Sequence, residues 1–233
     1  MKIAIMQPYF FPYIGYWQLI NAVDKFVVYD NIKFTKNSWI RRNRILVESR
    51  AKLFTLPIKN DSDYLDVCER YLSQTYKNGK KKLLNQIKSA YKQSSQFETV
   101  YSFIEELINY ENDNLFEYIY NSIIEILKYL NVDTEIFISS RIDVDHSLKN
   151  KFRVMAICKA LGGDVYINPI GGVELYDRKE FSQNCIGLKF LRTKELEYEQ
   201  FDAPFIPDLS MIDVMMFNNV EQINQMLGSY ELV

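Results

Sequence analysis

The chain has 233 residues, of which 48% are hydrophobic and 25% are charged, and its formal net charge is −2. This composition fits one globular domain with a sizeable core and excludes long disordered linkers. The charge argues against a nucleic-acid-binding protein, although a local basic cluster is still able to bind phosphate groups.

The cysteines and the apolar runs exclude further classes. Cys68, Cys158 and Cys185 are odd in number and show no CxxC spacing, so the sequence supports neither a disulfide framework nor a zinc site. No segment approaches about 18 uninterrupted apolar residues, and the opening run contains polar residues and Pro8, unlike a signal peptide. We expect a cytoplasmic protein without membrane insertion.

The first elements follow a β-loop-α-β pattern. KIAIMQ is typical of a buried parallel strand, GYWQLINAV has helical spacing, and KFVVYD resembles a second buried strand. KNSWIRRNRILVE and AKLFTLPIK predict a pair of strands, which Pro57 ends or places at an edge. From about residue 64 to 131 the apolar residues recur every three or four positions, which predicts helices.

The second half resumes a βαβ pattern. TEIFISS, VYINPIGG and GLKFLRT resemble strands, and KNKFRVMAICKALGG resembles a helix that Gly162 or Gly163 ends. The tail beginning PFIPDLSMID predicts an apolar helix with Ser210 as its N-cap. We therefore predict an α/β fold with a mostly parallel Rossmann-like sheet, a single domain over residues 1–233 and a helical insertion at about 64–131.

The loop QPYFFPYIGYW lies between the first strand and the first helix. Ligands of parallel α/β folds bind at the carboxyl ends of strands, beside helix N-termini that favour anions. Gln7, Tyr13, Gly15 and Tyr16 are candidate phosphate-binding residues, with Gly15 giving a ligand close access to the backbone. The alternative is a strand-to-helix turn that serves only aromatic packing.

A basic cluster, KFTKNSWIRRNRI, follows the second strand. On a strand Arg42 and Arg44 share one face, while Arg41 and Asn43 take the other. Arginine binds phosphate or carboxylate oxygens through paired donors, and Trp39 offers a face for a base or ring. We predict phosphate binding by the three arginines and substrate binding by Trp39 and Asn43. The alternative is a solvated basic edge that discourages aggregation.

The stretch SSRIDVDHSLKNKFR places Lys149, Lys151 and Arg153 at the start of a predicted helix. Cations oppose the helix dipole there, so a bound anion would explain them, and we assign Lys149 and Lys151 to phosphate binding. His146 is the only histidine, which gives no metal-ligand spacing, and we expect no metal site of protein ligands. It is a candidate general base, with a surface-loop histidine as the alternative.

A glycine pair closes the set of candidate motifs. NPIGGVELYD offers Asn168, Gly171 and Gly172 for substrate binding, but it matches neither the dinucleotide fingerprint nor the P-loop and is equally compatible with a tight turn. In PDLSMID we interpret Asp208, Ser210 and Asp213 as helix-capping residues.

Taken together, these motifs resemble the WbqC-like family of bacterial polysaccharide and O-antigen gene clusters. The resemblance covers nearly the whole chain and rests on QPYFFPYIGYWQLI, DKFVVYD, FTKNSWIRRNRI, LGGDVYINPIGGVELYD and LSMID. It implies a transferase of lipopolysaccharide biosynthesis that moves glycine or another acyl group onto an amino sugar.

A more distant similarity concerns YIGY, residues 13–16. It lies where nucleotidyltransferases and pantothenate synthetase-like ligases carry their HIGH motif, whose histidines hold ATP phosphates. Here tyrosines replace both histidines, and a neutral tyrosine donates a hydrogen bond without supplying charge. The positive charge for adenylyl transfer must then come from the arginines or lysines.

The two resemblances lead to one hypothesis. ATP with Mg²⁺ activates a small carboxylate such as glycine, and the amine of a nucleotide-linked amino sugar attacks it, with His146 or Asp30 accepting the proton. One alternative is transfer from a coenzyme A or acyl carrier protein thioester. The other is a non-catalytic binding module of polysaccharide assembly. The sequence is also compatible with a homodimer.

Overall fold

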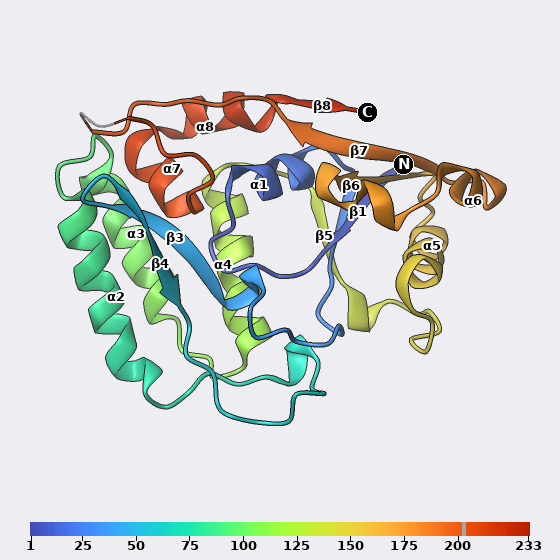
Figure 1. Cartoon of the computed structure of the whole chain (residues 1–233), viewed down its shortest axis with the longest axis horizontal. Coiled ribbons are helices and arrows are strands. Elements are labelled where there is room, and N and C mark those ends of the chain that lie inside the picture. The colour runs from blue at the N-terminus through green and yellow to red at the C-terminus, as the bar shows by residue number, and fades with distance from the viewer. Residues whose placement is uncertain (202–203) are drawn as a thin grey trace.

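The structure is a computed structural model that describes residues 1–201 and 204–233. Within them six strands form one sheet in the order β5-β2-β1-β6-β7-β8, parallel throughout except for the β7–β8 pair. The strands are β1 (Lys2–Met6), β2 (Lys25–Val28), β5 (Glu135–Ile138), β6 (Val165–Pro169), β7 (Gly187–Thr193) and β8 (Tyr230–Leu232). This order is that of a doubly wound sheet, so the predicted Rossmann-like α/β fold is confirmed (Figure 1).

Apolar clusters bury both faces of the sheet, which explains the continuous apolar strands. Ile3 and Ile5 of β1 pack in one cluster and Ala4 between them packs in the other. The larger cluster, with Ala4, includes α1 (Ile14–Asn21), α7 (Met211–Phe217) and α8 (Val220–Leu227), and the smaller includes α5 (Asn150–Ala160) and α6 (Arg178–Gln183). Each large buried side chain contributes roughly 1.5–3 kcal/mol to these layers.

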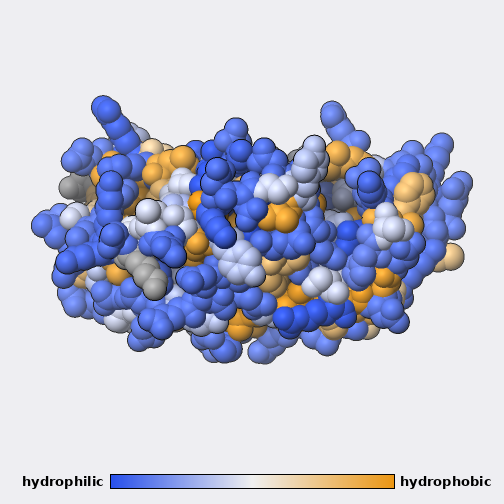
Figure 2. Space-filling view, turned by 90° about the horizontal axis from the view of Figure 1, so that it is seen from below, coloured by the Kyte–Doolittle hydropathy of each residue, from blue (hydrophilic) through white to orange (hydrophobic). Residues whose placement is uncertain are grey.

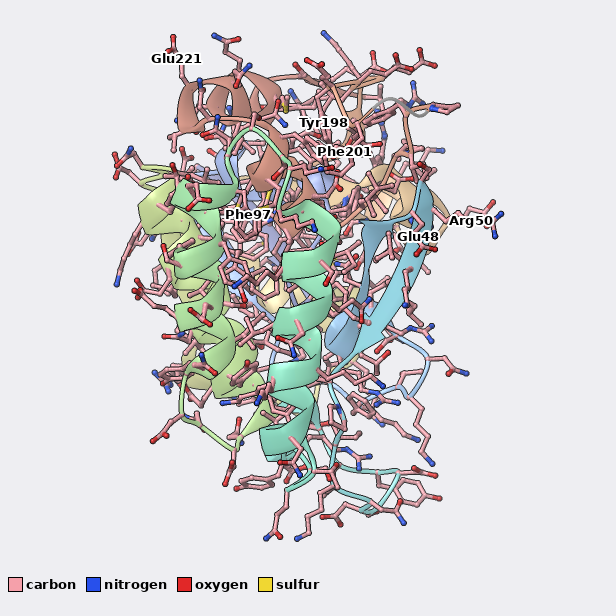
Figure 3. The ribbon with its side chains drawn as sticks, turned by 90° about the vertical axis from the view of Figure 1, so that its left-hand side faces the viewer. Glu48, Arg50, Phe97, Tyr198, Phe201 and Glu221 are labelled. Atoms are coloured by element: carbon pink, nitrogen blue, oxygen red, sulfur yellow. The ribbon has the colours of Figure 1, made fainter. Side chains whose placement is uncertain are left out.

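The chain between β2 and β5 forms a hairpin and three helices. Strands β3 (Arg42–Val47) and β4 (Arg50–Thr55) pair antiparallel, which confirms the predicted strand pair. The helices are α2 (Tyr76–Tyr91), α3 (Phe97–Asn109) and α4 (Leu115–Tyr129). Figure 3 shows α2 beside the hairpin, with α3 on the other side of α2; Glu48 lies in the turn of the hairpin and Arg50 begins β4.

The first of these helices begins later than the predicted start near residue 64. The residues before Tyr76 form the 3₁₀ turn η2 (Val67–Glu69) and isolated bridges, among them Lys33 with Asp66. Their backbone groups bond to the segment after β2, as when Val67 N–H donates to the Ile32 carbonyl at 3.0 Å. These long-range bonds replace the intrahelical bonds that a helix would require.

The C-terminal tail also differs from the prediction. Instead of one helix, α7 and α8 are separated at Asn218 and Asn219, and an edge strand, β8, follows. Ser210 stands at the predicted N-cap of α7, but its hydroxyl makes no capping hydrogen bond. The helix α5 ends as predicted beside Gly162, whose φ of 73° favours glycine. None of the helices in the described ranges is long and apolar enough to cross a membrane.

Candidate functional site

Predicted site residues from several strands meet at one edge of the sheet. Gln7 follows β1, Asp30 follows β2, and Asn168 lies near the carboxyl end of β6. The strand order reverses between β1 and β6, and ligands of doubly wound proteins bind outside such a reversal. Figure 2 views the molecule from below, and hydrophilic residues cover most of that face.

The loop after β1 is held by buried hydrogen bonds. Tyr16 is 2% exposed, and its hydroxyl donates to the Gln7 carbonyl at 3.0 Å. Burial raises the pKa of Tyr16 well above its ordinary value, so it stays a neutral donor. Asn43 is also buried, and its amide donates to the carbonyls of Phe10 and Phe11 at 3.2 and 2.7 Å. The buried groups of Tyr16 and Asn43 therefore hold the loop in place.

Packing against a neighbouring side chain explains why residue 15 is a glycine. A Cβ at that position would approach the Tyr13 ring to 2.5 Å, because the ring lies across the start of α1. The ring occupies the space in which we predicted a ligand to approach the backbone. Burial, followed by the charge of Asp208, raises the pKa of Tyr13, so its hydroxyl also stays protonated at neutral pH.

Tyr13 faces a hollow between the opening loop and the β3–β4 hairpin. We call it the tryptophan pocket; its volume is about 300 Å³, and its lining is Tyr9, Pro12, Tyr13, Trp39, Asn43, Arg44 and Asp208. Arg42 and Arg44 both lie over the Trp39 ring, 5.5 and 5.4 Å from its centroid. Arg41 instead donates to the Leu56 carbonyl at 3.0 Å. The pocket thus combines an aromatic face with the guanidinium group of Arg44, and Arg42 lies outside the lining.

A second group gathers at the ends of β2 and β5. We call it the strand-end cluster, and it consists of Asp30, Asn31, Ser140, His146 and Arg153. The Ser140 N–H donates to Asp30 Oδ1 at 2.9 Å, while Arg153 Nη2 and Asn31 Nδ2 lie 2.9 and 3.1 Å from His146 Nδ1. The two residues that we predicted as general bases, Asp30 and His146, therefore lie in one cluster. Asn31, which follows Asp30 in the chain, links the two through its contact with His146.

The hydrogen bonds of His146 determine which ring nitrogen carries the proton. Arginine has donors only, so Nδ1 of His146 accepts from Arg153 and the proton of the neutral ring is on Nε2. In this arrangement His146 is a hydrogen-bond donor at Nε2. Asp30 has the better geometry for a base, because only its Oδ1 accepts a hydrogen bond within the described chain.

The negative charge of Asp30 affects its neighbours. Burial and then the charge of Asp30 raise the pKa of the Cys68 thiol to about 11, so Cys68 is not a thiolate at neutral pH. Burial, followed by the charge of Glu69, raises the pKa of Asp66. No three His, Cys, Asp or Glu side chains of the described residues converge as metal ligands.

Arg153 makes no ion pair with a carboxylate of the described chain, although its charge partly opposes the rise of the Asp66 pKa that burial and Glu69 cause. It is 7% exposed, lies 5.1 Å from the Tyr29 ring centroid, and donates to the Asn31 carbonyl at 3.3 Å as well as to His146. No described carboxylate lies within ion-pair distance of it, and its Nε–H is buried without an acceptor. A buried, unpaired guanidinium is unfavourable unless an anion accompanies it.

Arg153 lies in the basic stretch from which we predicted phosphate binding by Lys149 and Lys151. Lys151 pairs with Glu180 at 2.6 Å, and Lys149 is exposed. Both line a separate hollow of about 560 Å³ with Phe152, Leu175 and Tyr176. Asn31 was not among the predicted site residues either. Its position directly after Asp30, at the end of a predicted strand, is the feature of the sequence that would have indicated it.

Of the two glycines after β6, packing requires a glycine at position 172 but not at position 171. A Cβ on Gly172 would come within 2.0 Å of Asn168 Nδ2, whereas a Cβ on Gly171 would meet nothing within 4 Å. Asn168 is buried, accepts from the Tyr166 hydroxyl at 3.0 Å and donates to the Pro169 carbonyl at 3.0 Å. Gly172 therefore accommodates the Asn168 side chain, while packing gives no reason for Gly171.

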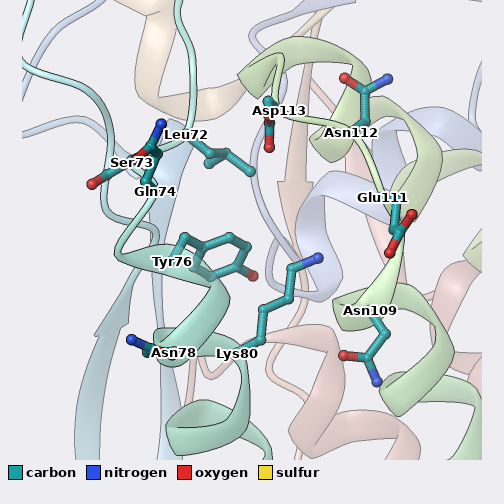
Figure 4. Close-up of a pocket in the computed structure, with 10 residues that line it drawn as sticks. All are labelled: Leu72, Ser73, Gln74, Tyr76, Asn78, Lys80, Asn109, Glu111, Asn112 and Asp113. Carbon is teal, nitrogen blue, oxygen red and sulfur yellow. The ribbon is translucent and has the colours of Figure 1, made fainter.

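The largest hollow described, about 1000 Å³, contains no predicted site residue. It lies in the helical segment, between the start of α2 and the α3–α4 loop, and Figure 4 shows Tyr76 and Lys80 of α2 facing Glu111 and Asp113 of that loop. Lys80 donates to the Tyr110 carbonyl at 2.9 Å. With two carboxylates beside one engaged lysine, this hollow is less suited to a phosphate than the arginine-containing sites.

The fold and the site define a Rossmann-like α/β protein with arginine side chains at the carboxyl edge of its sheet. The chain belongs to the WbqC-like protein family, whose model matches residues 7–225, and the family is associated with polysaccharide and O-antigen gene clusters. It is 40% identical over 58 residues to the uncharacterized protein Rv1507c of Mycobacterium tuberculosis, a match that spans 25% of each chain. No solved structure matches the chain significantly.

Proposed function

We propose that the protein transfers glycine or another small acyl group to the amine of a nucleotide-linked amino sugar, forming an amide in cytoplasmic steps of surface-polysaccharide biosynthesis. The observation that carries this proposal is Arg153. It is buried at the carboxyl edge of a doubly wound sheet without a carboxylate partner in the described chain. The diphosphate of a sugar nucleotide supplies an anion at the carboxyl ends of the strands, the edge of the sheet at which this fold favours ligands.

The strand-end cluster offers the groups that such a transfer needs. Arg153 and Nε2–H of His146 donate to phosphate oxygens, and Asp30 accepts the proton that the amine loses as its nitrogen attacks the acyl carbon. In the tryptophan pocket the Trp39 face stacks on a ring and Arg44 neutralises additional negative charge, with Arg42 adding positive charge from over the same tryptophan ring.

In the first version of this function, ATP activates the acyl group. A carboxylate oxygen attacks the α-phosphorus, pyrophosphate leaves, the sugar amine attacks the acyl adenylate, and AMP leaves as the amide forms. Tyr16 already donates to Gln7, and the Tyr13 ring covers Gly15, so the arginines are the candidates for stabilising the α-phosphate charge. The phosphates of ATP would supply many of the ligands of Mg²⁺.

The hollow beside α5 favours a second version, in which a thioester donates the acyl group. Phe152 and Leu175 are 58% and 70% exposed there, next to Lys149. Exposed apolar side chains beside a lysine match the apolar arm and phosphates of coenzyme A or an acyl carrier protein. In this version the amine attacks the thioester carbon and the thiol leaves.

A thermal-shift panel tests the proposal, with ATP, dTDP, UDP and coenzyme A each measured with and without Mg²⁺. A ligand at about 100 times its Kd stabilises the native state by about 2.7 kcal/mol. Shifts with dTDP or UDP are expected in both versions, an added ATP shift supports the adenylate, and an added coenzyme A shift supports the thioester. Product assays with glycine and an amino-sugar nucleotide then follow AMP or thiol release.

Matched variants connect the binding to the site. Arg153→Met should abolish the dTDP or UDP shift, whereas Asn78→Ala, which alters only the large hollow in the helical segment, should preserve it. If no nucleotide shifts the unfolding temperature of the wild type, a non-catalytic binding module becomes the better description.

A further inference from the structure

Arg70 is buried more completely than any other arginine in the described chain. It directly follows η2 and is 2% exposed. Its side chain makes no hydrogen bond or ion pair with a described residue, and its Nε–H is sealed from solvent. Its guanidinium carbon lies 4.9 Å from the centroid of the Phe34 ring. A carboxylate that senses its charge is Asp63, whose pKa is lowered first by the hydrogen bond and charge of Lys36 and to a smaller extent by Arg70.

The nearby carboxylates are engaged elsewhere. Asp63 pairs with Lys36 at 3.0 Å, and Glu69 accepts from the Asp66 N–H at 2.8 Å in the capping box of η2. An aromatic face attracts a cation but leaves the guanidinium donors unsatisfied. Burying such a charge without an acceptor opposes folding, so the position of Arg70 requires another explanation.

Arg70 and Arg153 are arranged in the same way around one segment. The segment is residues 29–34, which leave the carboxyl end of β2. Arg153 lies over the ring of Tyr29 at its start, and Arg70 lies over the ring of Phe34 at its end. Neither guanidinium has a carboxylate partner in the described chain. Two buried cations thus flank the segment that carries Asp30 and Asn31.

We infer that Arg70 is a second anion-binding residue of the strand-end cluster, and that this site takes a ligand with more than one anionic group. A diphosphate, free or within a nucleotide, has the required chemistry, because paired guanidinium donors match phosphate oxygens. The inference rests on the proposed function only in identifying that diphosphate as part of a sugar nucleotide.

The test uses the full-length protein, inorganic pyrophosphate as the probe, and two Arg→Met variants. Arg70→Met keeps the length of the side chain and removes the charge. The control is Arg178→Met, because Arg178 also lies over an aromatic ring, 5.8 Å from the Phe190 centroid, but is exposed on α6. Urea unfolding is measured without ligand, and pyrophosphate affinity is measured by calorimetry.

We expect ligand-free Arg70→Met to unfold at a urea concentration equal to or higher than that of the wild type, because the variant buries no unpaired charge. Its pyrophosphate affinity should fall at least tenfold, whereas Arg178→Met should bind as the wild type does. A variant that unfolds at lower urea and binds pyrophosphate normally would show that Arg70 has a structural role and overturn the inference.

A second variant covers the case in which Arg70→Met fails to fold. Arg70→Lys keeps the charge but loses the paired donors, so it should fold and bind pyrophosphate more weakly than the wild type. Undiminished binding by Arg70→Lys overturns the inference in that case. If these variants lose pyrophosphate binding but the wild type forms no amide, the inference stands and the proposed function is rejected. If the wild type forms the amide but its pyrophosphate affinity does not depend on Arg70, the proposed function stands and the inference is rejected.

Discussion

Asp213 is fully buried beneath the C-terminal segment, and no described cation pairs with it. Its carboxylate accepts from the hydroxyls of Tyr91 and Tyr198 and from Gln200 Nε2, each at 2.7 Å. We predicted a helix-capping role for this residue, which is wrong, because its oxygens are committed to these three side chains. Burial raises the pKa of Asp213, and the three hydrogen bonds only partly oppose the change.

This raised pKa predicts a pH dependence of stability. The folded protein holds the Asp213 proton more tightly than the unfolded chain, in which the pKa of an aspartate is about 3.9. The stabilisation is therefore present below that pH and is lost as the pH rises through the folded pKa. The free energy of unfolding of the wild type minus that of Asp213→Asn should be larger at pH 4 than at pH 7, as measured by urea denaturation.

Asp145 provides the opposite sign as a control. Its hydrogen bonds to Ser147 lower its pKa, so its stabilisation is present at neutral pH and is lost in acid. The same difference measured for Asp145→Asn should be larger at pH 7. A pH-independent difference for Asp213→Asn would contradict the raised pKa.

The two C-terminal helices begin at polar caps that differ in their contacts. Asn219 caps α8 by accepting the Gln222 N–H at 2.9 Å, and Gln222 returns a bond to the Asn219 N–H. Ser210 begins α7, but its hydroxyl is buried without a partner in the described chain. The identity of the cap residue alone therefore does not reveal its contribution.

Alanine substitutions at these caps should have different effects on stability. Asn219→Ala should lower the free energy of unfolding by about 0.5–2 kcal/mol, the usual loss for a capping side chain. Ser210→Ala should leave it unchanged or raise it by up to about 1 kcal/mol, because an unsatisfied buried hydroxyl is removed. Urea denaturation compares the two, and a larger loss for Ser210→Ala would show that its hydroxyl has a bonding partner.

Across the whole molecule, the helical segment shares its core with the sheet. The cluster that contains Phe26 and Val28 of β2 also contains Ile104 of α3 and Ile119 of α4, all fully buried. The helices between β2 and β5 therefore cover apolar surface that the sheet would otherwise expose to water.

Replacing residues 76–129 by a short flexible linker should consequently abolish cooperative folding. The sheet would lose the helices that complete its larger core, and a single core is the basis of two-state unfolding in a domain. Near-ultraviolet circular dichroism during urea denaturation measures this, with the full-length chain as the control. A native-like transition in the shortened chain would show that the helices form a separable domain.

The fold was more predictable than the site. Apolar runs and helical spacing indicated the parallel strands and the helices, because these patterns depend on which face of each element is buried. The strand β8 was missed because three residues, Tyr230–Leu232, carry too little pattern. Arg70 and Arg153 were not chosen because nothing in a linear sequence distinguishes a buried arginine from a solvated one.

The sequence by itself determined the α/β class and the family, since strand and helix patterns and the family motifs are local features of the chain. Only the tertiary structure decided that the Tyr13 ring covers Gly15, that Lys151 pairs with Glu180, and that Arg153 fixes the tautomer of His146. The physical reason is that the burial and charge environment of a side chain depend on residues distant in the chain. Those neighbours determine whether a polar group is already satisfied by the protein or is free to bind a ligand.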